Sequence, residues 1–278
     1  MRTMASCRCA LSVWLGLVIL SCTANASISI VPAYIEAGLD RGNVAKSITV
    51  TNSDDTTEQY RAQVYHFIFT KDGGVEKVEP DEHSLAPWIK LNPKEFTLGP
   101  KATRVIRMAV VPPSGLSPGE YWAAIEFEPL KGVVSSGGDS AGVSIKFEVI
   151  STILVPVVGT VGKPTHQGEF RDLQATVQSG KLQLEALLAN LGTGRLRFKG
   201  LYEIRDSKGE MVAQGAAGEA TVLPGAERRF IRTVDGPFDE SAKYDVQVRY
   251  TSDALEEDLA GRTTARRYVA PDTTNARN

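Results

Sequence analysis

The sequence SPGEYWAAIEFE, residues 117–128, decides the fold predicted for this chain. After a Ser-Pro-Gly turn, apolar side chains recur at every second position: Tyr121, Ala123, Ile125 and Phe127. A period of two is that of a β-strand with one face in a core. The same alternation predicts that Glu126 and Glu128 lie on the solvent face, where carboxylates are usually found.

Similar alternation runs along most of the 278 residues, and helical spacing of apolar residues is scarce. Further strands are predicted at residues 44–50, 60–69, 103–111, 182–188, 201–204 and 244–250. Polar and glycine-rich turns separate them, of which residues 71–74, Lys-Asp-Gly-Gly, are a strong hairpin signal because glycine adopts positive φ at little cost. The pattern indicates an all-β protein.

A second segment, ESAKYDVQVRY at residues 240–250, repeats the features of the first. In both segments a tyrosine, Tyr121 or Tyr244, stands at the entry of a strand, which resembles the tyrosine corner of immunoglobulin-like sandwiches. Two corners predict two immunoglobulin-like β-sandwich domains, at residues 27–158 and 159–270. Proline and glycine between Pro156 and Pro164 predict a short hinge between them. Residues 271–278 are predicted to form a polar tail.

Residues 1–26 have the features of a signal peptide. Arg2 and Arg8 precede a short apolar run, LSVWLGLVIL, and Ala24-Asn25-Ala26 is a suitable cleavage site before Ser27. The alternative is a lipoprotein signal that ends at Cys22, which would tether the chain to a membrane through a lipid. Export to the periplasm is predicted in the first case and a membrane lipoprotein in the second.

All three cysteines lie in this leader, so cleavage after Ala26 leaves no disulfide and no thiolate ligand or nucleophile. The leader carries two of the 31 basic residues and none of the 33 acidic ones, which leaves 29 basic against 33 acidic residues, a net charge of −4. This balance favours neither nucleic acid nor an anionic membrane as partner. The only membrane contact predicted is the lipid at Cys22.

The sequence contains no catalytic, cofactor or metal motif. The histidines, His66, His83 and His166, lack the spacing of metal ligands, and His66 is interpreted as an ordinary strand residue. Trp88 is interpreted as a core side chain, since apolar residues flank it. We therefore predict a protein that is not an enzyme and needs no cofactor.

Four stretches carry a resemblance to a known family: SISIVPAYIEA (27–37), SITVTNSDDTTEQYRAQV (47–64), WIKLNPKEFTLGPKATRVIRMAV (88–110) and VSIKFEVI (143–150). Together they resemble the PapD-like periplasmic pilus chaperones, and the likeness covers nearly the whole mature chain. The resemblance implies two immunoglobulin-like domains joined by a hinge. It also implies a periplasmic assembly chaperone whose partner is a protein subunit.

In that family the chaperone lends a strand of its first domain to a subunit that lacks one. The resemblance places this strand at residues 143 to about 155, after the small polar loop at 131–141, and assigns partner binding to Val143, Ile145, Phe147 and Val149. Alternation alone is equally compatible with these four side chains lining their own core. The family's Arg and Lys, which anchor the subunit's terminal carboxylate, are replaced by Ala33 and Ser151. Either the subunit is gripped differently or the chain is a divergent relative.

The function predicted is therefore a monomeric periplasmic assembly factor that binds incomplete β subunits of a pilus or surface polymer by donating an edge strand. The alternative is an exported or lipid-tethered β-sandwich protein that serves in surface adhesion or cell-wall binding. Processing at Cys22 favours the tethered protein, and cleavage after Ala26 favours the chaperone.

Overall fold

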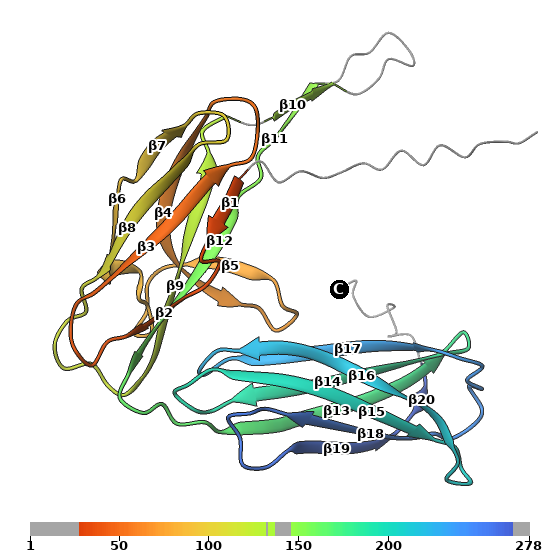
Figure 1. Ribbon diagram of the computed structural model, residues 1–278. Coiled ribbons are helices and arrows are strands. Elements are labelled where there is room, and N and C mark those ends of the chain that lie inside the picture. The colour runs from red at the N-terminus through yellow and green to blue at the C-terminus, as the bar shows by residue number, and fades with distance from the viewer. Residues whose placement is uncertain (1–27, 132, 137–145, 269–278) are drawn as a thin grey trace, which may run out of the picture.

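The computed structural model describes residues 28–131, 133–136 and 146–268, which form two β-sandwiches that meet at a corner (Figure 1). Among the described residues there are β-strands and one short 3-10 helix, η1 (Ala86–Trp88). The predicted all-β class is thus confirmed. In this part of the chain no helix has the length and apolarity needed to cross a membrane. The predicted leader, with Cys22, and the predicted tail at 271–278 lie outside the described residues.

The first sandwich packs two sheets face to face. One sheet has the order β1 (Ile28–Val31), β3 (Val44–Asn52), β8 (Thr103–Val110), β6 (Ile89–Asn92). The other has the order β2 (Ile35–Gly38), β12 (Ile153–Val161), β9 (Gly119–Pro129), β4 (Glu58–Phe69), β5 (Val75–Val78), and β7 (Glu95–Leu98) also pairs with β4. A separate two-stranded ribbon joins β10 (Val133–Ser136) to β11 (Lys146–Val149) and projects from this sandwich (Figure 1).

The second sandwich has two four-stranded sheets. Their orders are β17 (Glu227–Asp235), β14 (Lys181–Asn190), β13 (Gly168–Gln178), β20 (Arg266–Arg267), and β16 (Met211–Val222), β15 (Leu196–Arg205), β18 (Asp245–Thr251), β19 (Leu259–Thr264). Its core takes alternate residues from facing strands, such as Leu184 and Leu188 on β14 and Val246 on β18. Each sandwich has a core of its own, because each buries one face of both its sheets.

Both tyrosine corners are present, as predicted. The hydroxyl of Tyr121 donates to the carbonyl oxygen of Ser117 at 2.9 Å. The hydroxyl of Tyr244 accepts from the backbone N–H of Asp239, also at 2.9 Å. Each tyrosine hydroxyl is bonded to the turn before its strand, so the chain enters β9 and β18 through similar turns.

In strand β9 the prediction of the inward-facing side chains is confirmed, but the prediction that Glu126 lies exposed to solvent is wrong. Tyr121, Ala123, Ile125 and Phe127 all lie in the first core. Glu126, however, is only 8% exposed and forms an ion pair with Lys77 at 2.6 Å. β9 is the central strand of its sheet, and Lys77 of the β4–β5 hairpin reaches Glu126 on the second face, where Leu223 of the second sandwich is buried with Trp122 and Ala124.

The segment predicted to be a hinge is hydrogen-bonded to the second sandwich. Strand β12 continues to Val161, so the boundary predicted after residue 158 falls inside that strand. The following residues, 162–167, run along the turn at 191–194. The carbonyl oxygen of Thr165 accepts from the N–H groups of Thr193 and Gly194, and the carbonyl oxygen of Gln167 accepts from Leu191. These bonds attach the connection to the second sandwich.

The single long strand predicted from residue 143 to about 155 is interrupted. Strand β11 ends at Val149 and β12 begins at Ile153, with residues 150–152 outside any strand. The side chain of Ile150 is 50% exposed. The ribbon β10–β11 therefore belongs to a different sheet from β12, and the break between them lies at the top of the first sandwich (Figure 1).

Candidate binding edge and interdomain pocket

The first two described strands pair in different sheets, and part of β12 is left without a partner strand on one side. Strand β1 pairs antiparallel with β3, whereas β2 pairs parallel with β12. Strand β2 reaches only residues 157–160 of β12, from Val157 to Thr160. Among the described residues, the segment of β12 before Val157 pairs on one side only, with β9. The first four residues of β12 thus form a free sheet edge.

The direction in which the backbone N–H and C=O groups of β12 point shows which hydrogen-bond donors and acceptors are available at the free edge. The carbonyl oxygen of Thr160 accepts from the N–H of Leu39 at 2.8 Å, so this residue points its backbone groups away from β9. Alternate residues of a strand point to the same edge, which assigns Pro156 and Leu154 to the same side. Proline has no N–H. Leu154 therefore offers both a donor and an acceptor at the free edge, while Pro156 offers only an acceptor.

Strand β1 borders the same opening from the other sheet. It pairs with β3 on one side, and no strand of the described chain pairs with its second side. Its inward side chains, Ile28 and Ile30, are buried in the first core. A strand added beside β12 would close this end of the sandwich by ordinary backbone pairing.

The structure places the predicted site residues only in part. Val143 and Ile145 lie outside the described residues. Phe147 and Val149 are in β11, opposite Ser135 and Val133 of β10. Ala33 and Ser151, at the positions of the family's anchoring residues, are both exposed and lie between strands. Whether the four apolar side chains bind a partner stays a prediction.

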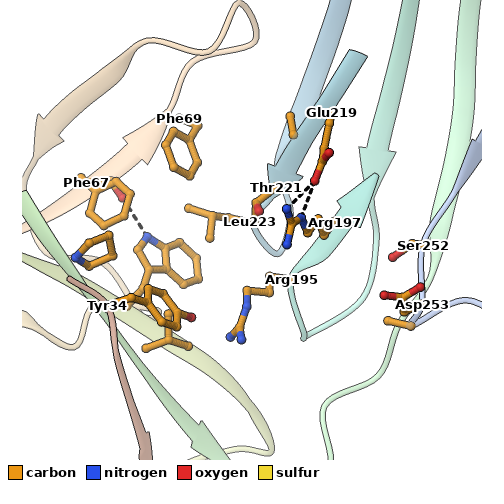
Figure 2. A pocket seen from close by; sticks show the side chains of 15 residues that line it. Tyr34, Phe67, Phe69, Arg195, Arg197, Glu219, Thr221, Leu223, Ser252 and Asp253 are labelled. Carbon is orange, nitrogen blue, oxygen red and sulfur yellow. Dashed lines mark hydrogen bonds and ion pairs between the residues drawn. The ribbon is translucent and has the colours of Figure 1, made fainter. Parts of the chain in front are cut away.

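A second candidate site is a pocket of about 780 Å³ between the two sandwiches (Figure 2). The first sandwich contributes aromatic side chains and the second a mixture of apolar and charged ones. The residues that line the pocket are Tyr34, Phe67, Phe69, Trp122, Pro156, Val158, Arg195, Arg197, Glu219, Ala220, Thr221, Leu223, Ser252, Asp253 and Ala254.

Apolar contact between the sandwiches forms the base of this pocket. Leu223 of the second sandwich is buried in one cluster with Phe67, Trp122 and Val158 of the first. The indole N–H of Trp122 donates to the carbonyl oxygen of Phe67 at 2.8 Å, which fixes the ring against the floor. Figure 2 shows Leu223 between the phenylalanines and the second sandwich. Burial of this cluster stabilises the contact between the domains.

Arg195 is a cation at the interface, and two carboxylates neutralise it. Its Nη1 donates to Glu120 at 2.7 Å and its Nη2 to Glu36 at 2.5 Å. Its guanidinium also lies 5.8 Å from the ring centre of Tyr34. Burial alone would lower the pKa of Arg195, but Glu120, Tyr34 and Glu36 together raise that pKa above its ordinary value. Arg195 is therefore charged and fully engaged.

Tyr34 is held in its neutral form beside this group. Burial is the main cause that raises its pKa to about 12, and Glu36 and Glu120 act in the same direction, while Arg195 opposes them. The Tyr34 hydroxyl donates to Glu36 at 3.4 Å. Tyr34 consequently presents a neutral aromatic side chain to the pocket.

The β4–β5 hairpin makes a second contact between the sandwiches, on the far side of Leu223. The backbone N–H of Arg229 donates to the carbonyl oxygen of Lys71 at 2.7 Å. The Lys71 ammonium forms an ion pair with Glu227 at 2.5 Å, and Asp72 lies 3.5 Å from Arg229. Together with the pair Glu120–Arg195, this contact holds the domains at two separated points.

The histidines do not form a metal site in the described part of the chain, where no cluster of three His, Cys, Asp or Glu side chains occurs. His66 is fully buried, with Nδ1 3.3 Å from the carbonyl oxygen of Trp122 and Nε2 3.0 Å from Asp81. His83 stacks on the ring of Trp122, with ring centres 5.3 Å apart. Both histidines therefore pack around the tryptophan that forms the pocket floor.

Trp88 lies where the sequence predicted. Its ring is partly buried against the first core and lies 5.2 Å from the ring of Tyr121. This contact links η1 to the first tyrosine corner. Trp88 does not line the interdomain pocket.

Sequence reasoning missed the residues of the interdomain contact. A signal for it is present at residues 121–125, YWAAI, which is apolar at consecutive positions. A continuous apolar run is typical of a strand buried on both faces, and it marks Trp122 and Ala124 as covered. No comparable signal exists for Arg195, because its two partners are 75 and 159 residues away.

The fold and this interface define a two-domain protein made of immunoglobulin-like β-sandwiches. No family model and no curated protein matches the sequence. Among solved structures, the chain is similar to one from a chaperone–tip adhesin complex of CFA/I fimbriae biogenesis (13% identity, 86% of this chain and 99% of the other, TM-score 0.44). It is also similar to the class 5 fimbriae chaperone CfaA (12% identity, 86% and 98%, TM-score 0.42).

A third similar structure is a chain of the CsuC–CsuE chaperone–tip adhesion subunit pre-assembly complex of the archaic chaperone-usher Csu pili of Acinetobacter baumannii. The identity is 14%, the match covers 88% of this chain and 100% of the other, and the TM-score is 0.42.

Proposed function

We propose that this protein is a periplasmic assembly chaperone that binds incomplete β subunits of a pilus or surface polymer at the free edge of its first sandwich. The observation that carries the proposal is the one-sided pairing of β12 before Val157. An extended partner segment gains affinity from backbone hydrogen bonds at such an edge and specificity from alternate side chains. A subunit that lacks a strand is the natural partner, because the same pairing completes its own sheet.

The side chains offered to the subunit are those of Val143, Ile145, Phe147 and Val149. They precede the free edge in the chain and alternate with period two. Ile150 and Leu154, 50% and 37% exposed, are further apolar side chains at the surface near the free edge. Removal of these groups from water on subunit binding supplies the hydrophobic part of the affinity.

The proposal is tested by charged substitutions in the donor strand, Ile145→Asp and Phe147→Asp. We expect both variants to fold with little change in thermal unfolding and to lose the subunit that wild type recovers by crosslinking and pull-down from the periplasm. The matched control is Lys146→Asp, which places the same new carboxylate on the opposite face of the strand.

Two outcomes contradict the proposal. Unfolding of the first sandwich together with loss of capture shows that Ile145 and Phe147 are core residues, since a buried unpaired carboxylate costs several kcal/mol. Folded variants that still capture the subunit exclude the donor strand altogether.

The free edge has a test of its own. Leu154→Pro removes an N–H that points away from β9, so we expect the ladder with β9 and the fold to persist while subunit capture weakens. The control is Val155→Pro, which removes an N–H directed at β9 and should reduce the free energy of unfolding. Equal capture by Leu154→Pro and wild type contradicts pairing at this edge.

Location in the periplasm as a processed chain is part of the same proposal. Mass spectrometry of the mature protein should find an N-terminus at Ser27. A lipid-modified N-terminus at Cys22 favours the tethered surface protein instead.

A further inference from the structure

We propose that the outer face of the β1–β3–β8–β6 sheet docks reversibly on a membrane surface that contains anionic phospholipid. This surface is called the basic face below, after its outward cations Lys90 and Arg107. It lies on a different sheet from the free edge of β12. The inference therefore goes beyond the proposed function and does not depend on it.

The first argument is charge. None of the residues in the four strands is acidic, and four are basic: Lys46, Lys90, Arg104 and Arg107. Among the described residues none of these four has an ion-pair partner. The outward arginines of the second sandwich differ, since they are paired with carboxylates, as Arg262 is with Asp245. A positive potential therefore extends from the basic face, although the chain as a whole is acidic.

The second argument is the arrangement of these cations. Lys90 and Arg107 point outward, because the residues before and after each of them in the strand are buried. Arg107 pairs with Ser47 on one side and with Asn92 on the other. Together with Lys46, these four side chains line a hollow of about 670 Å³ whose lining contains no carboxylate. Phosphate oxygens accept hydrogen bonds from all the charged and amide groups gathered there.

An apolar row lies next to the cations on the same face. Val31 of β1 and Val105 of β8 lie on the two sides of Thr49 in one cross-strand row. Their side chains are 61% and 50% exposed. Val105 is two residues before Arg107, so both side chains point to the same side of β8. Apolar groups beside cations suit a membrane interface, where apolar burial and attraction to anionic lipid act together.

The composition of the basic face distinguishes a membrane from other anionic partners. None of the residues in its four strands is aromatic. Specific protein interfaces centre on buried aromatic anchors, and single-stranded nucleic acid stacks its bases on aromatic rings. A bilayer needs neither, because its phosphates move laterally and adopt the spacing of the cations. One Lys or Arg near an anionic bilayer strengthens binding about fivefold, so the three cations at the hollow enrich the protein roughly hundredfold at the surface.

The basic face is free while the rest of the molecule is engaged. The second sandwich packs on the opposite sheet, where Leu223 is buried with Trp122 and Val158. The free edge of β12 belongs to that opposite sheet as well. The protein can therefore dock on a membrane and hold a partner at β12 at the same time.

The proposal is tested by sedimentation of the purified exported protein with vesicles. One set contains equal parts of phosphatidylglycerol and phosphatidylcholine, and the other contains phosphatidylcholine alone. We expect binding to the anionic set at low salt, a loss of this binding as salt is added, and no binding to the neutral set.

Four variants assign the binding to the basic face. Lys90→Ser and Arg107→Ser should each weaken binding to the anionic vesicles about fivefold, and the double variant about 25-fold. The matched control is Lys199→Ser, which removes an exposed lysine from β15 of the second sandwich and should leave binding unchanged. Val105→Ser shortens the apolar row and should weaken binding without changing its salt dependence.

Equal binding of wild type to both sets of vesicles overturns the proposal, and so does a double variant that binds the anionic set like wild type. Capture by immobilised poly-glutamate without vesicle binding identifies an acidic polypeptide as the occupant. Displacement from the vesicles by glycerol phosphate at the concentration of the lipid phosphate identifies a site for a free phosphate compound. Either result also overturns the proposal. The chaperone function is judged separately, by subunit capture, which the double variant should retain.

Discussion

Arg195 of the second sandwich donates from its backbone N–H and from Nη1 to the two carboxylate oxygens of Glu120 in the first, at 2.8 and 2.7 Å. The backbone N–H of Glu120 in turn donates to the carbonyl oxygen of Thr193 at 2.8 Å. Glu120 is only 8% exposed, so water competes little for these bonds. One residue of β9 is therefore joined through three hydrogen bonds to the turn between β14 and β15 of the second sandwich.

Replacement of this carboxylate should separate the domains. Glu120→Ala leaves the N–H of Arg195 without its acceptor and the guanidinium with Glu36 alone, and we expect a loss of about 1–3 kcal/mol in the free energy of unfolding. Calorimetry should resolve two thermal transitions, and small-angle scattering should show a wider range of domain arrangements. Glu219→Ala, which removes the partner of exposed Arg197, is the control and should leave a single transition. Identical behaviour of the two variants contradicts a special role for Glu120.

Because residues 162–167 lie close against the turn at 191–194, we expect a single added methyl group at Gly192 to destabilise the connection between the domains. A Cβ at residue 192 would collide with the backbone oxygen of Thr165 and lie 2.9 Å from the N atom of Gln167. Backbone atoms cannot rotate away as a side chain does, so Gly192→Ala should cost about 1–3 kcal/mol of stability and expose residues 162–167 to proteolysis. Gly99→Ala is the matched control, since a Cβ there meets no atom within 4 Å. Resistance of Gly192→Ala to protease, equal to wild type, would show that the connection is not held by this contact.

The two tyrosine corners should contribute separately to the two domains. Tyr121→Phe removes the hydrogen bond to Ser117, and Tyr244→Phe removes the bond from Asp239. Each loss should reduce the stability of its own sandwich by about 0.5–1.5 kcal/mol, the net value of one such bond. Denaturant unfolding followed by domain-resolved hydrogen exchange measures this. An effect of either variant on the other domain alone would argue against independent cores.

Acid should weaken the second sandwich through Asp245. Hydrogen bonds from Arg262 are the main cause that lowers the pKa of Asp245 below its ordinary value of 3.8. The unfolded chain therefore binds this proton at higher pH than the folded one, and the stabilisation is complete above pH 3.8 and lost as pH falls through the lower, folded pKa. Wild type should be more stable than Asp245→Asn at pH 7, and the difference should vanish in strong acid. A difference that persists at the lowest pH at which the protein still folds contradicts this assignment.

The local sequence was sufficient to predict the strands and the two tyrosine corners. Alternation at Tyr121, Ala123, Ile125 and Phe127 predicted the inward face of β9, because a strand repeats its direction every second residue whatever surrounds it. The tyrosine corner depends on a turn four or five residues away, so it could be read from the sequence. The Lys-Asp-Gly-Gly turn likewise gave the β4–β5 hairpin, in which Gly73 has φ +91°.

The second face of β9 was decided by the tertiary structure. Glu126 obeys the alternation rule and points away from the first core, yet it is only 8% exposed, and its carboxylate pairs with Lys77 of β5. On the same face Trp122 and Ala124 are buried in one cluster with Leu223 of the second sandwich. The same holds for the connection between the domains, whose proline and glycine suggested a hinge. Its bonds to residues 191–194 depend on where the second sandwich folds back.

By itself the sequence determined an all-β chain, the inward faces of its main strands and its two tyrosine corners, since each follows from side chains within a few residues of one another. The tertiary structure alone decided the free edge of β12, the charge balance around Arg195 and the apolar pocket between the sandwiches. The physical reason is distance along the chain. Glu36 and Glu120 meet Arg195 only where the two sandwiches pack together, and no local pattern encodes that contact.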